Sequence, residues 1–276
     1  MTHAHGTHAG GTHAHGGHRP GSYTHGHHES VLRSHRWRTA ENSAAYLLPS
    51  LLPGMSLLDV GCGPGTLTAD LAERVRPGPV TAVEPIPTAL ALASEETVGR
   101  GTANVRFAVA DVHTLGFADG AFDVVHAHQV LHHVADPVRA LRELRRVCRP
   151  GGVVAARDTD FAAYAWFPQV PGLDDWLAGF RRLVRANGGE PDAGRRLLSW
   201  ARAAGFSDVA ATASVWCFAS PEDRAWWGGM WADRLLQSDL AGQLPDGPRL
   251  ADAWREWAAA PDGWFLIPYG EIIARP

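Results

Sequence analysis

The feature that most constrains the fold is a short apolar strand that runs directly into a glycine-rich turn. Leu57 to Val60 supply the strand, Gly61-Cys62-Gly63-Pro64-Gly65 supplies the turn, and a helical stretch begins near Thr66. Closely spaced glycines let backbone N–H groups approach a ligand, because no side chain stands in the way. This strand, turn and helix are typical of α/β folds that bind a nucleoside-containing cofactor at the turn.

The spacing of the glycines favours one kind of cofactor over another. Enzymes that bind NAD usually carry G-x-G-x-x-G, whereas Gly61, Gly63 and Gly65 follow G-x-G-x-G. An acid, Asp59, precedes the turn inside the strand, where it is poorly placed for a pyrophosphate and well placed for an ammonium group. An NAD-dependent oxidoreductase therefore stays open as an alternative with a weaker match.

Strand-like and helix-like patterns alternate up to about residue 158. Continuous apolar strands between amphipathic helices indicate a parallel sheet covered on both faces. After residue 158 the alternation ends and helical patterns dominate. We expect a Rossmann-like α/β fold whose seven-stranded, mostly parallel sheet has helices on both faces and a helical lid. The expected strands lie near 56–60, 79–84, 104–109, 122–127, 152–157, 207–216 and, in the edge region, 264–273. The expected helices run from Thr39 to about Leu51 and near 66–75, 87–98, 137–147, 173–186, 192–204, 221–241 and 248–259.

The chain divides into a tail and one domain. Residues 1–28 consist mainly of His, Gly, Thr and Ala and carry almost no apolar surface to bury, so they are expected to be disordered. The length of 276 residues suits a single well-filled domain over 29–276. The tail histidines can bind Zn²⁺ weakly, but no folded cage positions them, and no metal site is predicted.

Composition excludes several classes of protein. The formal net charge is -4 and no long basic run occurs, which argues against nucleic acid as a partner. All 25 basic residues are Arg, so mechanisms that need a Schiff-base or P-loop lysine are excluded. Three cysteines form no disulfide framework, and no apolar run reaches the roughly 18 residues of a membrane span. We expect a cytoplasmic monomer or homodimer that acts on a small-molecule partner.

Two acids follow the next two expected strands. Glu84 lies about 20 residues beyond the glycines, where such folds hold the ribose hydroxyls. Asp111 can accept a hydrogen bond from an adenine amine while the N–H of Val112 faces the ring. The alternatives are an acid at a helix N-terminus for Glu84 and a surface-loop acid for Asp111.

Taken together, the motifs resemble those of class I S-adenosylmethionine-dependent methyltransferases, particularly the ubiquinone and menaquinone biosynthesis enzymes. The resemblance covers about residues 50–158 and implies S-adenosylmethionine as the cofactor. It implies that the glycines bind the methionine side, Ile86 packs against adenine, and His128 meets the methionine end. Besides the glycine turn, Glu84 and Asp111, it rests on Phe122-Asp123-Val124-Val125, Leu131-His132-His133-Val134 and Arg149-Pro150-Gly151-Gly152.

The loop after the fourth strand narrows the acceptor. It contains His126-Ala127-His128-Gln129, which lacks the Asn/Asp-Pro-Pro-aromatic signature of adenine and amide N-methyltransferases. We therefore expect O-, C- or N-methylation of a small, apolar or aromatic metabolite. The alternative is a protein of this fold that binds the cofactor but directs another reaction, such as a cyclisation.

Two pairs of residues are candidates for catalysis and acceptor binding. His132 and His133 are the candidate bases, because histidine titrates near neutral pH, although a packed structural role is the alternative. Trp227 and Trp231 lie one helical turn apart, within the lid expected over 216–262, and are candidates for lining an acceptor pocket. Ordinary core packing is the alternative for the tryptophans.

Overall fold

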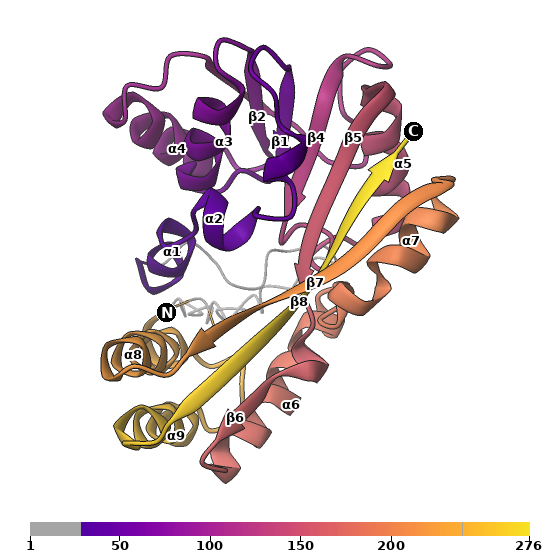
Figure 1. Cartoon of the computed structure of the whole chain (residues 1–276). Helices are drawn as coiled ribbons and strands as arrows, with labels where there is room; N and C mark the ends of the chain where they lie inside the picture. Colours follow the sequence, from indigo (N-terminus) through magenta and orange to yellow (C-terminus); the bar gives the residue numbers. More distant parts are fainter. Residues whose placement is uncertain (1–28, 239) are drawn as a thin grey trace, which may run out of the picture.

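The computed structural model describes residues 29–238 and 240–276 (Figure 1), so the expected disordered tail, 1–28, lies outside the described residues. The α-helices are α1 (Glu29–Arg36), α2 (Ala40–Ser43), α3 (Thr66–Val75), α4 (Pro87–Gly99), α5 (Pro137–Val147), α6 (Pro171–Ala186), α7 (Leu197–Ala203), α8 (Pro221–Gln237) and α9 (Gly247–Ala259), and the 3₁₀ helices are η1 (Leu48–Ser50), η2 (Phe161–Ala163) and η3 (Ala193–Arg196). The strands are β1 (Leu57–Val60), β2 (Val80–Glu84), β3 (Val105–Val109), β4 (Phe122–His128), β5 (Cys148–Thr159), β6 (Ala165–Phe167), β7 (Asp208–Phe218) and β8 (Trp264–Arg275).

The sheet confirms the Rossmann-like fold. Its order is β3-β2-β1-β4-β5-β8-β6, with β7 paired to β8 off this path. Strands β1 to β5 pair in parallel, and β8 runs antiparallel to β5, β6 and β7. Because the polypeptide crosses over between parallel strands, the loops at their carboxyl ends meet at one edge of the sheet.

Two expectations about the sheet were wrong. It has eight strands and not seven, because Ala165–Phe167 forms a three-residue strand too short to show an alternating pattern. The last strand does not lie at the edge, because β5 and β6 pair with different halves of β8 on one side and β7 pairs along the other.

The N-terminal segment also differs from the expected helix between Thr39 and Leu51. A capping box between Thr39 and Asn42 begins α2, but the backbone leaves the helical conformation at Ala44 (φ -136°). A 3₁₀ turn containing Pro49 follows. Ala40, Ala44 and Leu47 are nevertheless fully buried, and α1 precedes them without having been predicted.

The helices of the parallel half follow the sequence closely. In α5 the side chain of Asp136 caps the first turn by accepting from the N–H of Arg139, and Pro137 occupies the first helical position. Its buried residues recur every three or four positions, as expected for one apolar face against a sheet. They are Ala140, Leu141, Leu144 and Val147.

The C-terminal half has its own aromatic core. Helices α6, α8 and α9 lie beside the half of β8 that pairs with β6, away from α3 and α4 (Figure 1). Trp231 lies at the centre, with its ring 4.6 Å from that of Trp176 and 5.8 Å from that of Trp254. Instead of reaching the expected 241, α8 ends at Gln237, and the expected helix 192–204 divides into η3 and α7.

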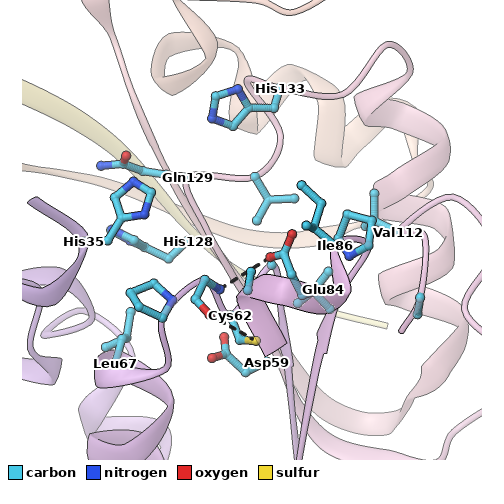
Figure 2. A pocket seen from close by; sticks show the side chains of 18 of the residues that line it. His35, Asp59, Cys62, Leu67, Glu84, Ile86, Val112, His128, Gln129 and His133 are labelled. Carbon is cyan, nitrogen blue, oxygen red and sulfur yellow. Dashed lines mark hydrogen bonds between the residues drawn. The ribbon is translucent and has the colours of Figure 1, made fainter. Parts of the chain in front are cut away.

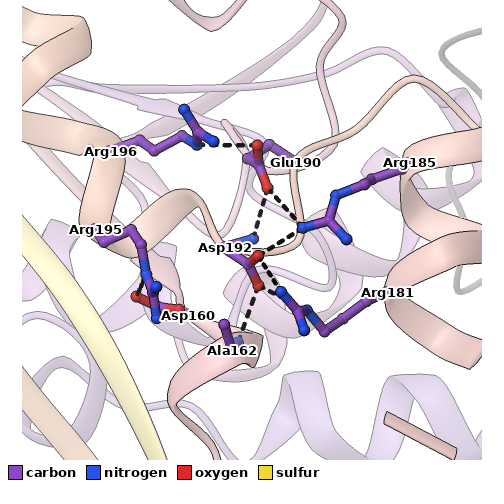
Figure 3. A network of polar contacts seen from close by, with 8 residues as sticks. All are labelled: Asp160, Ala162, Arg181, Arg185, Glu190, Asp192, Arg195 and Arg196. Atoms are coloured by element: carbon purple, nitrogen blue, oxygen red, sulfur yellow. Dashed lines mark hydrogen bonds and ion pairs between the residues drawn. The ribbon is translucent and has the colours of Figure 1, made fainter. Parts of the chain in front are cut away.

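A network of ion pairs stabilises the segment between α6 and η3 (Figure 3). Asp192 accepts from Arg181 and from Arg185 at 2.6 Å each, and from the N–H of Ala162 at 2.9 Å. Only 9% of the Asp192 side chain is exposed, so these bonds are less screened than surface pairs. The N–H of Glu190 donates to the carbonyl of His132, so the network supports the loop that follows β4.

Among the described helices, none is both long and apolar enough to span a lipid bilayer.

Candidate functional site

A cavity of about 440 Å³ opens at the carboxyl ends of β1, β2 and β4. This is the place where open α/β sheets bind their ligands, and the volume falls in the range of small-molecule pockets. Figure 2 shows Ile86 and Val112 at one end of the cavity, Glu84 near the middle, and His35, His128 and Gln129 together at the other end.

Two of the three predicted glycines line the cavity. A Cβ on Gly61 would lie 2.4 Å from a methyl group of Val130, so the turn has no room for a side chain there. A Cβ on Gly63 would meet nothing closer than the ring of His35 at 3.9 Å, so it would project into open space. Gly65 does not line the cavity. Its Cβ would lie 2.7 Å from the Cα of Ala93 on α4, so the structure places Gly65 in helix packing rather than against the ligand.

Glu84 lies where the sequence predicts a ribose contact. It ends β2, lines the cavity and accepts a hydrogen bond of 3.4 Å from the N–H of Gly63. Burial raises the pKa of this carboxyl, and the N–H groups of Gly63 and Ile86 act in the opposite direction. A half-buried carboxylate with free lone pairs can accept from the two hydroxyls of a ribose.

The other three predicted cofactor contacts, Asp111, Val112 and Ile86, also line the cavity. Asp111 Oδ1 accepts from both the N–H and the ring Nδ1 of His113 at 2.8 Å each. The first of these bonds is the main cause of a lowered pKa, so the carboxylate stays ionised and keeps Oδ2 available. Ile86 and Val112 lie beside it on the cavity wall, and Val112 is buried.

Asp59 lines the cavity but already has two partners of its own. Its Oδ1 lies 2.8 Å from Nδ1 of His126, and its Oδ2 accepts from the hydroxyl of Thr68 at 2.6 Å. All three side chains are buried. The sequence prediction missed His126, which pairs in register with Asp59 across β1 and β4.

His128 ends β4 and lines the cavity. Its side chain is buried, and within the described part of the chain neither ring nitrogen has a hydrogen-bond partner. Burial, followed by the charges of Arg38 and Arg157, holds the pKa of His128 well below its usual value. The ring is therefore neutral at pH 7.

Two side chains from the N-terminal segment complete this end of the cavity and were missed from the sequence. They are His35, in α1, and Arg38, in the loop before α2. Arg38 donates to Oε1 of Gln129 at 2.7 Å, and Gln129 donates to the hydroxyl of Tyr269 at 3.1 Å. The sequence offered one signal for this end of the cavity, namely Gln129, a polar residue that directly follows the histidines of β4.

The two predicted bases have different surroundings. His132 does not line the cavity, and its Nδ1 lies 2.6 Å from Oδ1 of the buried Asp158. Burial lowers the pKa of His132 to about 3 and raises that of Asp158 to about 7. His133 lines the cavity, and burial holds its pKa well below the usual value.

The predicted acceptor-binding tryptophans lie elsewhere. Trp227 and Trp231 are 4% and 2% exposed and belong to the aromatic core of the C-terminal half. Neither lines the cavity, so their one-turn spacing reflects core packing in this structure. The helices that do reach the cavity are α3, α4 and α1, and α1 packs against α8.

The site fits a nucleoside-containing cofactor with a charged tail. The cavity wall carries an acid suited to ribose, Glu84, an acid suited to adenine, Asp111, and a turn with no room for a Cβ at Gly61. The fold and site thus define a Rossmann-like cofactor-binding protein.

Comparison with known proteins identifies the family. Residues 58–156 match the methyltransferase domain family. An uncharacterized methyltransferase of Schizosaccharomyces pombe is 36% identical over 257 residues, which cover 88% of this chain and 92% of that relative. A probable methyltransferase of Aspergillus luteorubrus is 27% identical over 278 residues, with 88% and 93% covered. The chain therefore belongs to the class I S-adenosylmethionine-dependent methyltransferases, and the NAD-dependent alternative is wrong.

Solved structures agree on the fold. The YcgJ protein of Bacillus subtilis has a TM-score of 0.58 at 19% identity and covers 85% of this chain and 98% of its own. The [4+2]-cyclase SpnF has a TM-score of 0.52 at 24% identity, with 93% and 89% covered. The TM-scores support a shared fold. Identities this low do not distinguish a methyltransferase from a cyclase.

The finer resemblance to quinone enzymes extends over only part of the chain. The ubiquinone/menaquinone biosynthesis C-methyltransferase UbiE of Bdellovibrio bacteriovorus is 38% identical over 101 residues, which cover 37% of this chain and 43% of that protein. The family is thus established, whereas membership of the quinone group is not.

Proposed function

We propose that this enzyme methylates a small, apolar or aromatic metabolite at the His128 end of the cavity. The observation that carries the proposal is the extent of the cavity, which continues beyond the cofactor residues to His35, Arg38 and Gln129. The whole cavity of about 440 Å³ must also hold the cofactor, so the space beside it suits a small organic acceptor rather than a macromolecule.

The proposed cofactor contacts follow from the positions on the cavity wall. Glu84 binds the ribose, Asp111 and Val112 bind adenine beside Ile86, and Gly61 and Gly63 face the methionine part. Asp59 faces the same part, with His126 and Thr68 holding its carboxylate in place. S-adenosylmethionine supplies a methyl group activated by its sulfonium.

The protein contributes alignment and exclusion of water. In-line displacement at a sulfonium needs the acceptor held in one geometry, which can lower the barrier without a dedicated base. Apolar side chains supply most of the acceptor end, and a few polar groups fix the orientation, as is common in small-molecule sites. The apolar side chains are Leu32, Leu67, Val130 and Val134.

Of the two histidines predicted as bases, we keep His133 as the candidate. It lines the cavity and is neutral at pH 7, so it can accept a proton. His132 is committed to Asp158 and does not reach a ligand, so we assign it no proton transfer. The cytoplasmic location and the monomeric or homodimeric state stay predictions.

The test combines cofactor binding with product detection. Isothermal titration of the full-length chain should show binding of S-adenosylmethionine and S-adenosylhomocysteine and loss of both in Glu84→Ala. Incubation with a mixture of small phenols, acids and amines should release S-adenosylhomocysteine, detected by mass spectrometry, together with a methylated product. Conversion of an acceptor without S-adenosylhomocysteine would instead support the cyclisation alternative, and absence of cofactor binding would overturn the proposal.

A further inference from the structure

The acceptor end of the cavity contains three polar side chains to which the cofactor contacts proposed above assign no hydrogen bond. They are the guanidinium of Arg38, the amide of Gln129 and the imidazole of His128. They come from separate elements, the loop before α2 and the end of β4, and Figure 2 shows His128 and Gln129 beside each other. A ligand at this end would meet all three.

Charge at this end is positive. Arg38 is the one arginine among the described residues that line the cavity, and the chain has no lysine. The positive charge of Arg38 adds to burial in lowering the pKa of the His128 imidazole. Figure 2 shows Glu84 nearer to Ile86 than to His128, and Asp111, which also lines the cavity, directly precedes Val112. The carboxylate of Asp59 is held by His126 and Thr68.

Gln129 is held in a fixed and unusual conformation. Its φ is +54°, one of two non-glycine residues in the described chain with positive φ. Arg38 and Tyr269 bind the two ends of its amide, at 2.7 and 3.1 Å. Strained backbone of this kind concentrates at ligand sites, where the surrounding structure holds it in place.

His128 supplies the independent sign that a ligand belongs here. Its side chain is buried at 5% exposure, lines the cavity and has no hydrogen-bond partner among the described residues for either nitrogen. A buried polar group without a partner is destabilising, so native structures rarely leave one without a ligand or ordered water.

We propose that Arg38, Gln129 and His128 form a subsite for an ionised oxygen of the acceptor, so that the enzyme acts on small organic acids such as carboxylates or phenolates. A guanidinium binds such oxygens through charge-assisted hydrogen bonds, which are stronger than neutral ones. The N–H of a neutral His128 adds one further donor. This inference rests on the proposed function, because it defines the acceptor for the same cavity.

The experiment measures binding to the full-length protein saturated with S-adenosylhomocysteine. Four ring compounds of similar size serve as probes: benzoate, 4-nitrophenol at a pH where it is ionised, methyl benzoate and benzylamine. Benzoate, the nitrophenolate or both should bind in calorimetry, and the neutral ester and the cation should bind at least tenfold more weakly. Preference between the two anions separates a carboxylate from a phenolate acceptor.

Two variants test the residues. Arg38→Gln should weaken anion binding about 10- to 100-fold, as expected when a charge-assisted hydrogen bond is lost. Gln129→Glu keeps the shape and the contacts to Arg38 and Tyr269 but adds a negative charge, so it should also abolish anion binding. Arg36→Gln, which removes the same charge from α1 outside the cavity, is the matched control and should bind like wild type.

The outcomes separate this inference from the proposed function. If the wild-type protein does not bind S-adenosylhomocysteine, the proposed cofactor site itself is refuted. Normal S-adenosylhomocysteine binding with no anion preference, or with unchanged benzoate affinity in Arg38→Gln and Gln129→Glu, would overturn the acidic-acceptor subsite alone.

Discussion

Asp59 and His126 form a buried pair across two neighbouring parallel strands, with 2.8 Å between Oδ1 and Nδ1. Thr68 binds the other carboxylate oxygen. This pair fixes the orientation of a carboxylate that faces the cavity from below the glycine turn, and it links the cofactor site to the centre of the sheet.

Replacing Asp59 should therefore affect both stability and binding. Asp59→Ala leaves the imidazole of His126 and the hydroxyl of Thr68 buried without their partner, which should cost about 1–3 kcal/mol of unfolding free energy for each group left unpaired. Cofactor affinity should fall as well. Urea denaturation and calorimetry measure the two effects, with Asp262→Ala, at an exposed carboxylate, as control. Unchanged stability would show that the pair contributes nothing to folding.

The dependence of stability on pH should reveal the buried His132. Its pKa is about 3 in the folded protein and about 6.5 when unperturbed, so its contribution is complete above pH 6.5 and is lost as the pH falls toward 3. Asp158 acts in the opposite direction, because its pKa is raised to about 7. Its contribution is complete below pH 3.8 and is lost as the pH rises through 7.

His132→Gln should remove the first contribution and keep the second. Between pH 6.5 and 5 the unfolding free energy of wild type should lose up to about 1.4 kcal/mol per pH unit relative to the variant. Denaturant titrations at several pH values measure this difference. Parallel curves for the two proteins would mean that His132 titrates alike when folded and unfolded.

The two tryptophans predicted for the acceptor pocket should behave as core residues. Trp227→Ala and Trp231→Ala should each cost about 3–5 kcal/mol, because the rings are almost fully buried among other aromatic side chains. Trp264→Ala, at a ring that is 37% exposed, should cost much less. Thermal melts measure the loss. A stable variant with normal cofactor binding but poor acceptor use would instead restore the acceptor-wall role.

The parallel half of the fold was predictable because its signals are local. Gly and Pro residues mark where helices and strands begin and end. The predicted helices 66–75 and 137–147 agree with α3 and α5 at both ends. The residues at Glu84, Asp111 and Gly63 follow from strand ends alone, since parallel strands bring those ends to one edge.

The rest of the site depends on contacts that sequence spacing does not encode. The pair between Asp59 and His126 requires the register of β1 against β4. Arg38, in the loop before α2, lines the cavity, although no periodicity in the sequence predicts this position. The stripe of Trp227 and Trp231 is ambiguous by nature, because an apolar helix face looks the same whether it meets a ligand or three other helices.

Gly63 and Gly65 offer a final, matched test of where the cofactor passes. Both have positive φ, +54° and +85°, so alanine at either position incurs a backbone cost of roughly 1–2 kcal/mol. A Cβ on Gly63 projects into the cavity, whereas one on Gly65 collides with the backbone of Ala93. The shared backbone cost cancels, so any further difference reports what each Cβ meets.

Gly63→Ala should thus lower S-adenosylmethionine affinity at least tenfold, at a stability cost close to that of the backbone alone. Gly65→Ala should lose a further 1–3 kcal/mol or so of stability, because overpacking between α3 and α4 forces a shift. Its folded fraction should bind the cofactor nearly as wild type does. Calorimetry at a temperature where both variants are folded, combined with urea denaturation, separates the two effects. The opposite pattern, with affinity lost only in Gly65→Ala, would place the cofactor on the α4 side of the turn.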